Sequence, residues 1–200
     1  MNKRVGVFLS RMQPLHIGHL GIIEMALKEN DKVIVLIGSK NKNGTIRNPM
    51  DINLRREILD EALEEKFGNE LKNRIIISEL PDWSMETELE SNHEWGKYLY
   101  YNIVSLAEKK QFSMYFSDER EIIEAWFEEY LKERITLRIF ERNNMFDRVS
   151  STKIREAFFS DDRKYIEKSC PDAVIRRYDE IKKIIKTVYE NPREDYKMEE

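Results

Sequence analysis

Short apolar runs recur along the chain, and five of them have the length and composition of β-strands. They are rich in β-branched and aromatic residues and are bounded by polar or turn-forming residues. The clearest run, KVIVLIGS at 32–39, is almost continuously apolar, which indicates a strand buried on both faces, as in a parallel sheet. The predicted strands are residues 4–10, 32–39, 74–78, 113–117 and 136–140.

Between these runs lie stretches in which apolar residues recur with the spacing of a helix. Helices are predicted over residues 19–29, 51–67, 93–110 and 119–132, with a loop over 81–92. Strand and helix thus alternate along most of the chain. This alternation predicts an α/β fold with a doubly wound, five-stranded parallel sheet covered by helices on both faces.

After the fifth strand the pattern contains only helices, which are predicted at 150–159, 162–169 and 172–189. The residues that follow, 191–200, are charged, and we expect them to be frayed. A chain of 200 residues can bury a sizeable core. We therefore expect residues 1–149 to form the sheet-containing core and residues 150–200 to be a helical segment that completes the same domain.

Charge and cysteine content narrow the possible partners and compartment. The 34 basic and 38 acidic residues give a net charge of -4, which provides no overall attraction to nucleic acid or an anionic membrane. A phosphate ligand must therefore be bound by locally placed cations. The single cysteine, Cys170, cannot form an internal disulfide, which favours a reducing compartment and a structural thiol. We find no signal peptide or membrane span and expect a cytoplasmic protein.

The loop between the first strand and the first helix concentrates groups that suit a phosphate. It contains Arg11, His16, Gly18 and His19, and two of the three histidines of the chain lie in it. Ligands of doubly wound sheets bind at the carboxyl ends of the strands, and helix N-termini attract anions. His16 and His19 are three residues apart and so share one side of the first helical turn. A metal site is the weaker alternative, since no third ligand is evident nearby.

A second polar segment, VSSTKIR at 149–155, follows the fifth strand. Its hydroxyls can cap the helix that begins there, and Lys153 and Arg155 add positive charge. Taken alone, this segment is typical of an ordinary capped surface helix. Its position after a strand places it at the same edge of the sheet as the first loop, where both could contact one anion.

Together the two segments resemble a known family. The first, SRMQPLHIGH, is similar to the (H/T)xGH signature of the nucleotidyltransferase superfamily, often written GxFxPxHxGH, and the second is similar to its ISSTxxR motif. The resemblance extends loosely over residues 4–189 and is greatest to archaeal-type nicotinamide-nucleotide adenylyltransferases. Three positions depart from the pattern: Ser10 replaces a usual glycine, Met12 a usual phenylalanine, and Ser117-Asp118-Glu119 a Ser-Asn-Asn stretch.

The resemblance implies a Rossmann-like nucleotidyltransferase fold and a set of residues around ATP. His16 and His19 would contact the triphosphate, with His19 at the α-phosphate, while Arg11 and Arg155 would hold the β- and γ-phosphates. Magnesium would bridge phosphate oxygens instead of occupying a protein cage. An acceptor phosphate would attack in line and release pyrophosphate without a covalent intermediate. The remaining ATP-binding candidates are Ser10, Met12, Gly18, Ser150, Ser151 and Thr152.

The implied acceptor is nicotinamide mononucleotide, which would give NAD. The segment 43–55, NGTIRNPMDINLR, resembles the family's Thr-x-x-Asn-Pro-Phe stretch and the arginine after it, which makes Thr45, Asn48 and Arg55 candidates. Arg47 is a further candidate because of its charge. Trp95 matches a family tryptophan that stacks on the nicotinamide ring, although a core position is an equally good interpretation.

Two neighbouring residues complete the acceptor set. Trp83 competes with Trp95 for the stacking role, and Asp82 could contact a ribose, although a solvated acid is the simpler interpretation. The partners implied are the small molecules ATP and nicotinamide mononucleotide, and a homo-oligomer is implied as well.

Other functions remain open from the sequence. A related enzyme could transfer adenylyl or cytidylyl groups to pantetheine phosphate, flavin mononucleotide or a small phosphorylated alcohol, and the altered stretch 117–119 favours keeping this alternative. A second alternative is a non-catalytic nucleotide sensor. The presence of both histidines argues against it, because a sensor would not need to retain them. An aminoacyl-tRNA synthetase fragment also has a His-Ile-Gly-His loop, but the chain lacks a Lys-Met-Ser-Lys-Ser type segment.

Overall fold

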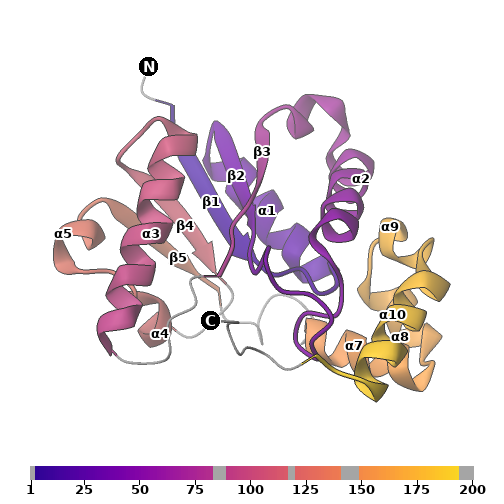
Figure 1. Ribbon diagram of the computed structural model, residues 1–200. Helices are drawn as coiled ribbons and strands as arrows, with labels where there is room; N and C mark the ends of the chain where they lie inside the picture. The colour runs from indigo at the N-terminus through magenta and orange to yellow at the C-terminus, as the bar shows by residue number, and fades with distance from the viewer. Residues whose placement is uncertain (1–2, 83–88, 117–119, 141–148, 194–200) are drawn as a thin grey trace.

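The structure is a computed structural model that describes residues 3–82, 89–116, 120–140 and 149–193. Its five strands form one parallel sheet in the order β3-β2-β1-β4-β5, which confirms the predicted doubly wound α/β fold (Figure 1). The strands are β1 (Val5–Ser10), β2 (Lys32–Ile37), β3 (Ile75–Glu79), β4 (Phe112–Phe116) and β5 (Ile135–Ile139).

The strand order reverses at β1, which lies in the middle of the sheet. In register, Phe8 of β1 pairs with Val35 of β2 on one side and with Tyr115 of β4 on the other. The connections that leave β1 and β4 therefore diverge to opposite faces of the sheet. A crevice is expected where they separate, at the carboxyl ends of these two strands.

Alternate side chains of β2 contribute to two separate cores. Val33, Val35 and Ile37 point into one core, and Ile34 and Leu36 into the other. All five are buried because helices cover both faces, which explains why this strand has no polar alternation. The first core is covered by α1 (Ile17–Glu29), α2 (Ile52–Lys72) and the C-terminal helices. The second is covered by α3 (Leu89–Ala107), α4 (Arg120–Glu124) and α5 (Glu129–Lys132).

The C-terminal helices pack together beside α2 (Figure 1). Ser150 caps the first of them by accepting a hydrogen bond from the Lys153 amide at 3.3 Å. Cys170 lies buried in the same core, where desolvation raises its pKa to about 12 and leaves the thiol unreactive. The helices are α7 (Ser151–Ser160), α8 (Arg163–Ser169), α9 (Asp172–Ile175) and α10 (Tyr178–Glu190). No helix in the described part of the chain is long and apolar enough to cross a membrane.

Several predicted helix limits were wrong. The predicted helix 119–132 is interrupted between α4 and α5, where the Trp126 amide bonds to the Ile123 carbonyl in a tight turn. Helix α2 continues five residues past Phe67, across a kink at Gly68, whose φ of 68° suits glycine. The predicted loop 81–92 is too long, because α3 begins at Leu89.

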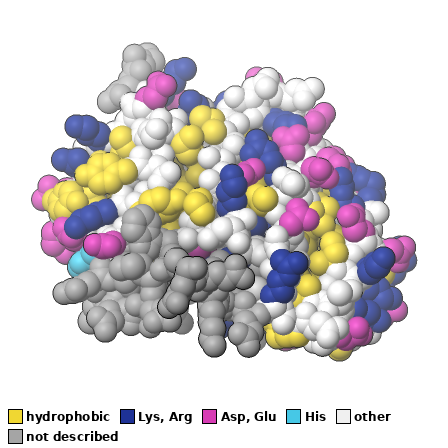
Figure 2. Space-filling model, viewed as in Figure 1, with side chains coloured by type: hydrophobic (Ala, Val, Ile, Leu, Met, Phe, Trp, Pro, Cys, Tyr) yellow, Lys and Arg dark blue, Asp and Glu magenta, His cyan; other side chains and the backbone are white. Residues whose placement is uncertain are grey.

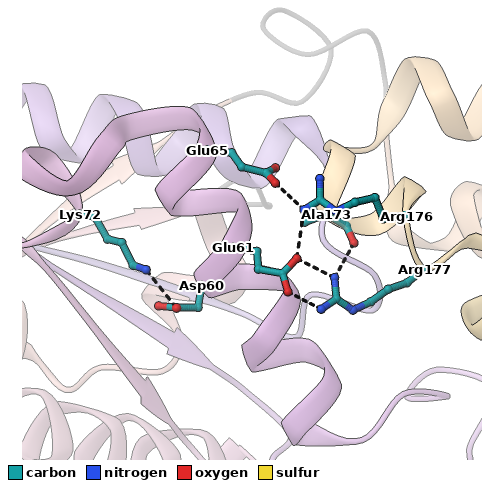
Figure 3. Close-up of polar contacts among 7 residues, drawn as sticks. All are labelled: Asp60, Glu61, Glu65, Lys72, Ala173, Arg176 and Arg177. Carbon is teal, nitrogen blue, oxygen red and sulfur yellow. Dashed lines mark hydrogen bonds and ion pairs between the residues drawn. The ribbon is translucent and has the colours of Figure 1, made fainter.

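The predicted helix 172–189 is also divided, between α9 and α10, and the residues at the break bind α2 (Figure 3). The Arg177 guanidinium reaches both carboxylate oxygens of Glu61, one of them at 2.7 Å. Arg176 donates to Glu61 at 3.0 Å and also pairs with Glu65. These contacts fix the C-terminal helices against α2 through a bidentate arginine–carboxylate pair.

This ion cluster makes a testable contribution to stability. Its arginines, Arg177 first, lower the pKa of Glu61 from 4.5 to about 2. A lowered carboxyl pKa stabilises the folded state above pH 4.5, and that stabilisation is lost as the pH falls toward 2. Glu61→Gln should reduce the free energy of unfolding at pH 7 by about 1 kcal/mol or less, because the carboxylate is 40% exposed. Chemical denaturation at several pH values measures this.

The matched control is Glu70→Gln, which removes an exposed carboxylate from the same helix. Glu70→Gln should leave stability nearly unchanged. Equal effects of the two substitutions, or a Glu61→Gln effect that does not shrink below pH 4.5, would contradict a specific role for the cluster.

Candidate active site

A cavity of about 990 Å³ opens at the carboxyl ends of β1, β2 and β4. This is the edge of the sheet where the strand order reverses, and the volume suits a small-molecule ligand. Three sequence candidates, Thr45, Asn48 and Arg55, do not line it. The candidates that do line it are Ser10, Arg11, Met12, His16, Gly18, His19, Arg47, Asp82, Trp95, Ser150, Ser151, Thr152 and Arg155.

The two histidines form a stacked pair at the start of α1. His16 is the N-cap residue, and its ring lies 3.6 Å from that of His19, centroid to centroid, with 22° between the planes. The His16 amide donates to Nδ1 of His19 at 3.2 Å. Since Nδ1 accepts, the proton of the neutral His19 ring is on Nε2. The backbone therefore orients His19 with an N–H donor toward the cavity side of β1.

Ser10 acts on His19 across this loop. Its Oγ lies 2.9 Å from Nε2 of His19, and it accepts a weaker hydrogen bond from the Met12 amide at 3.4 Å. With the proton on Nε2, the histidine donates and the serine accepts. Glycine at this position would leave Nε2 without this intramolecular acceptor. The departure at Ser10 therefore changes the surroundings of His19 itself.

Helix α7 is bonded directly to the first loop, although the two are far apart in sequence. The Ser151 hydroxyl donates to the Pro14 carbonyl at 3.2 Å, and Nη1 of Arg155 donates to the Gln13 carbonyl at 2.8 Å. Arg155 is 6% exposed, and its Nε–H has no acceptor among the described residues. A buried guanidinium with an unused N–H on a cavity wall suits an anionic ligand.

Positive charge dominates the cavity wall even though the chain as a whole is acidic. Arg11, Arg47 and Arg155 contribute fixed charges. The described wall has two acids, Asp82 and Glu156. Asp82 accepts a hydrogen bond from Ser39 at 2.9 Å and forms an ion pair with Lys42 at 3.2 Å. No group of three potential metal ligands occurs among the described residues. The cavity therefore suits a highly charged anion.

Arg55 was predicted to contact the acceptor, but its guanidinium is buried and is not part of the cavity lining. Nη1 donates to the carbonyls of Arg11 at 2.9 Å and Gly38 at 2.7 Å, and Nη2 donates to that of Ser39 at 3.0 Å. Burial lowers the pKa of Arg55 to about 10, so the group stays charged at neutral pH. Arg55 thus joins the loops that follow β1 and β2, and it supports the cavity wall from behind.

Thr45 and Asn48 were also predicted to contact a ligand, and they too are buried. They close a tight turn in which the Asn48 amide donates to the Thr45 hydroxyl at 3.0 Å. Ile46 and Arg47 lie at the tip of this turn and line the cavity. Thr45 and Asn48 therefore fix the shape of the loop, and Arg47 is the charged residue that the loop presents to the cavity.

The C-terminal segment holds this loop in place. The Arg193 amide donates to the Gly44 carbonyl at 2.9 Å, and its guanidinium donates to Oδ1 of Asn43 at 2.7 Å. Tyr189, near the end of α10, lines the cavity as well. Residues far beyond the second motif thus contribute to the wall.

Two tryptophans also line the cavity. Trp95 of α3 is half-buried and packs edge-on against Trp126, with 6.1 Å between ring centroids. Gly96 permits this contact, because a Cβ there would lie 1.7 Å from the Trp126 carbonyl oxygen. Trp95 therefore belongs to a core cluster and to the cavity at the same time.

Sequence reasoning missed several residues that line the cavity. Trp126 was assigned to a continuous helix, and Tyr189 lies far from both motifs, so neither carried a signal. Gln13 lies inside the first motif, and its side chain binds the Met50 backbone in both directions, at 2.8 and 3.0 Å. Trp83 and the stretch 117–119 lie outside the described residues.

Comparison with known proteins assigns the family. The model of the cytidylyltransferase-like family matches residues 7–157, which include both the histidine loop and α7 up to Arg155. The chain belongs to this family. It is therefore a nucleotidyltransferase-family protein, and both polar segments of the sequence lie within the matched residues.

Two archaeal proteins are similar to this cytidylyltransferase-like chain. Nicotinamide-nucleotide adenylyltransferase of Saccharolobus solfataricus is 34% identical over 94 residues, 47% of this chain and 50% of that protein. The protein of the same name from Pyrococcus furiosus is 39% identical over 77 residues, 38% of this chain and 40% of that protein. The chain thus spans about half the length, or less, of the curated relatives it matches.

Solved structures share the fold of this cytidylyltransferase-like chain at low identity. A bifunctional NMN adenylyltransferase/ADP ribose pyrophosphatase from Francisella tularensis, complexed with AMP and a Mn ion, has a TM-score of 0.61. It is 23% identical, with 79% of this chain and 42% of that chain covered. Nicotinic acid mononucleotide adenylyltransferase from Plasmodium falciparum has a TM-score of 0.56 at 14% identity, with 88% and 98% covered.

Proposed function

We propose that this protein transfers AMP from ATP to nicotinamide mononucleotide, forming NAD and pyrophosphate. The observation that carries the proposal is one cavity lined both by the stacked histidine pair and Arg155 and by the Trp95–Trp126 pair. The polar residues suit a triphosphate, and the tryptophans suit a flat cationic ring. The similarity to archaeal nicotinamide-nucleotide adenylyltransferases supports the same acceptor.

In this proposal the triphosphate lies at the N-terminus of α1. The amides of the first turn, including that of Gly18, and the positive end of the helix dipole favour negative charge there. Nε2–H of His19 turns from Ser10 to an α-phosphate oxygen, where charge grows during attack. Arg11 and Arg155 hold the β- and γ-phosphates and stabilise the departing pyrophosphate.

The acceptor binds on the opposite side of the cavity. Its nicotinamide ring stacks on Trp95, its ribose contacts Asp82, and Arg47 binds its phosphate. One oxygen of that phosphate attacks the α-phosphorus as the bond to the β-phosphate oxygen breaks. Because both reactants are phosphates, the protein supplies alignment and positive charge, with no protein nucleophile.

The described wall fits a magnesium ion bound through the substrate. No group of three potential protein ligands occurs among the described residues, and Asp82 is already bonded to Ser39 and Lys42, so a magnesium ion would be held mainly through the substrate. The bound ion would neutralise charge between phosphate oxygens. We also propose that residues 150–200 complete the domain formed by residues 1–149, which the bonds from Ser151 and Arg155 to the first loop support.

A pyrophosphate-release assay tests the function. Turnover is expected only when ATP, magnesium and nicotinamide mononucleotide are all present, and NAD should appear in equal amount to pyrophosphate. Substituting nicotinate mononucleotide reports the acceptor preference. Absence of turnover with any combination, together with stabilisation of the protein by ATP or NAD, would instead support a nucleotide sensor.

A cytidylyltransferase is the second candidate, because the chain belongs to the cytidylyltransferase-like family. In that case CTP would replace ATP, and the acceptor would be another small phosphorylated molecule. Running the assay with CTP and with pantetheine phosphate, flavin mononucleotide or a phosphorylated alcohol separates the two. Faster pyrophosphate release from CTP than from ATP would reject the adenylyl transfer that we propose.

Trp95→Ala should mainly affect the acceptor. Loss of stacking is expected to raise the KM for nicotinamide mononucleotide by about tenfold, equivalent to about 1.4 kcal/mol, with little change in the KM for ATP. Steady-state kinetics with each substrate varied in turn measures both constants. Trp95→Phe keeps an aromatic face and should recover much of the loss. If Trp95→Ala instead raised only the KM for ATP, Trp95 would contact ATP and the proposed placement of the two substrates would be wrong.

A further inference from the structure

A second cavity, of about 900 Å³, lies at the opposite edge of the sheet from the active-site cavity. Its floor is formed by the amino-terminal ends of β1, β4 and β5, and its rim by the end of α1 and the segment that precedes β4. The chain enters the sheet here (Figure 1). None of the residues proposed to act on ATP or the acceptor lines this cavity.

The wall of this cavity is strongly basic. Seven of its sixteen residues are lysine or arginine and two are glutamate, in a chain whose net charge is -4. Figure 2 shows lysine and arginine side chains at the upper left of the molecule, around the amino-terminal end. The cations are Lys3, Arg4, Lys28, Lys109, Lys110, Arg134 and Arg138. Concentrating like charge around a hollow raises the potential inside it and attracts anions.

Two of these cations are already paired with carboxylates. Lys28 lies 2.7 Å from Glu24, and Arg138 lies 3.5 Å from Glu29, which also accepts a hydrogen bond from the Tyr115 hydroxyl at 2.8 Å. No carboxylate among the described residues lies within ion-pair distance of the side chains of Arg4 or Lys110. The charges of Arg4 and Lys110 are therefore available to a ligand.

A buried hydrogen-bond network contributes to the wall of this cavity. Tyr115 is fully buried, and its hydroxyl accepts a hydrogen bond from the Asn30 amide at 2.7 Å while donating to Glu29. Asn30 also donates to the Ala26 carbonyl at 2.9 Å and lies against Gly6. This network gives the cavity a polar lining beside its cations.

We propose that this basic cavity binds a small multivalent phosphate anion, of the class of inorganic tripolyphosphate or the polyphosphate chain of a nucleotide. A hollow of about 900 Å³ has the size of a small-molecule site, which fits a compact anion better than an extended nucleic-acid strand. The inference is independent of the proposed reaction, because it uses the other edge of the sheet.

Inorganic tripolyphosphate is the probe, and amide chemical shifts of the 24.1 kDa protein give a readout for each site. Titration should produce saturable shifts at residues 28–31 and 109–113, separately from any shifts at residues 10–19 of the active site. Arg4→Glu combined with Lys110→Glu should weaken binding at the basic cavity by about tenfold or more. The hydrogen bonds that these two residues make with the described residues use only their backbone atoms, so the fold should be kept.

Lys183→Glu is the matched control, because Lys183 is exposed on α10, away from this cavity. It should leave the shifts at the basic cavity unchanged. If the double glutamate variant melts early, the double glutamine variant at the same positions should show a smaller loss in the same direction. Shifts confined to residues 10–19, unchanged affinity in the double variant, or shifts with an oligonucleotide but not with tripolyphosphate would each overturn the proposal.

Discussion

Replacing His19 with alanine should lower kcat by about 10²–10³-fold, the loss typical of removing one preorganised donor to a developing negative charge. The dissociation constant for ATP should change far less, because we propose that the contact strengthens as the α-phosphate is attacked. The stacked His16 ring and the backbone bond to Nδ1 hold the Nε2 donor in position before substrate arrives. Single-turnover kinetics and equilibrium binding of a non-hydrolysable ATP analogue measure the two quantities separately.

Ser10→Gly provides the matched control for this prediction. It removes the present acceptor of His19 Nε2 and restores the residue that the family usually has. Turnover of the Ser10→Gly variant should stay within a few-fold of the original, since the histidine itself is retained. Equal losses of kcat and ATP affinity in His19→Ala would make His19 a simple binding residue and contradict the role proposed for it.

Arg155→Lys should lower kcat/KM for ATP by about 100-fold, equivalent to about 2.8 kcal/mol, although the charge is conserved. Nη1 of Arg155 is already used to bind the Gln13 carbonyl, while Nε remains for a ligand. A lysine ammonium cannot occupy both positions at once. Varying ATP at a saturating acceptor concentration measures the loss, and thermal melting shows whether the buried lysine also weakens the fold.

Lys153→Ala is the control for Arg155 because it removes an exposed cation from the first turn of the same helix. Its effect on kcat/KM should be no more than a few-fold, as expected for a solvent-screened charge. If Lys153→Ala lowers kcat/KM as much as Arg155→Lys does, the loss reflects the general positive potential around α7. The proposed direct contact between Arg155 and the triphosphate would then be wrong.

The sheet could be predicted from the sequence because its strands are short apolar runs whose burial leaves no other secondary structure equally favourable. The position of the cavity followed from the same pattern, since the histidine loop comes directly after β1. The division of the predicted C-terminal helix could not be foreseen. The residues at the break, Arg176 and Arg177, make ion pairs with α2, and sequence periodicity carries no information on such tertiary contacts.

Individual side chains showed the same limit. Motif resemblance selected Arg55, yet its direction depends on three backbone carbonyls that only the folded chain brings together. Thr45 and Asn48 likewise form a turn, and the residue they present, Arg47, was chosen for its charge. Ser10 was noted as a departure, but its contact with His19 required the loop geometry.

The segment near Tyr189 and Arg193 lies beyond the residues that define the family, which end at 157. It nevertheless supplies part of the cavity wall and holds the loop that carries Arg47. Substitutions in this segment can therefore reshape the cavity without touching the histidine loop or α7. A comparison restricted to residues 7–157 would not register them.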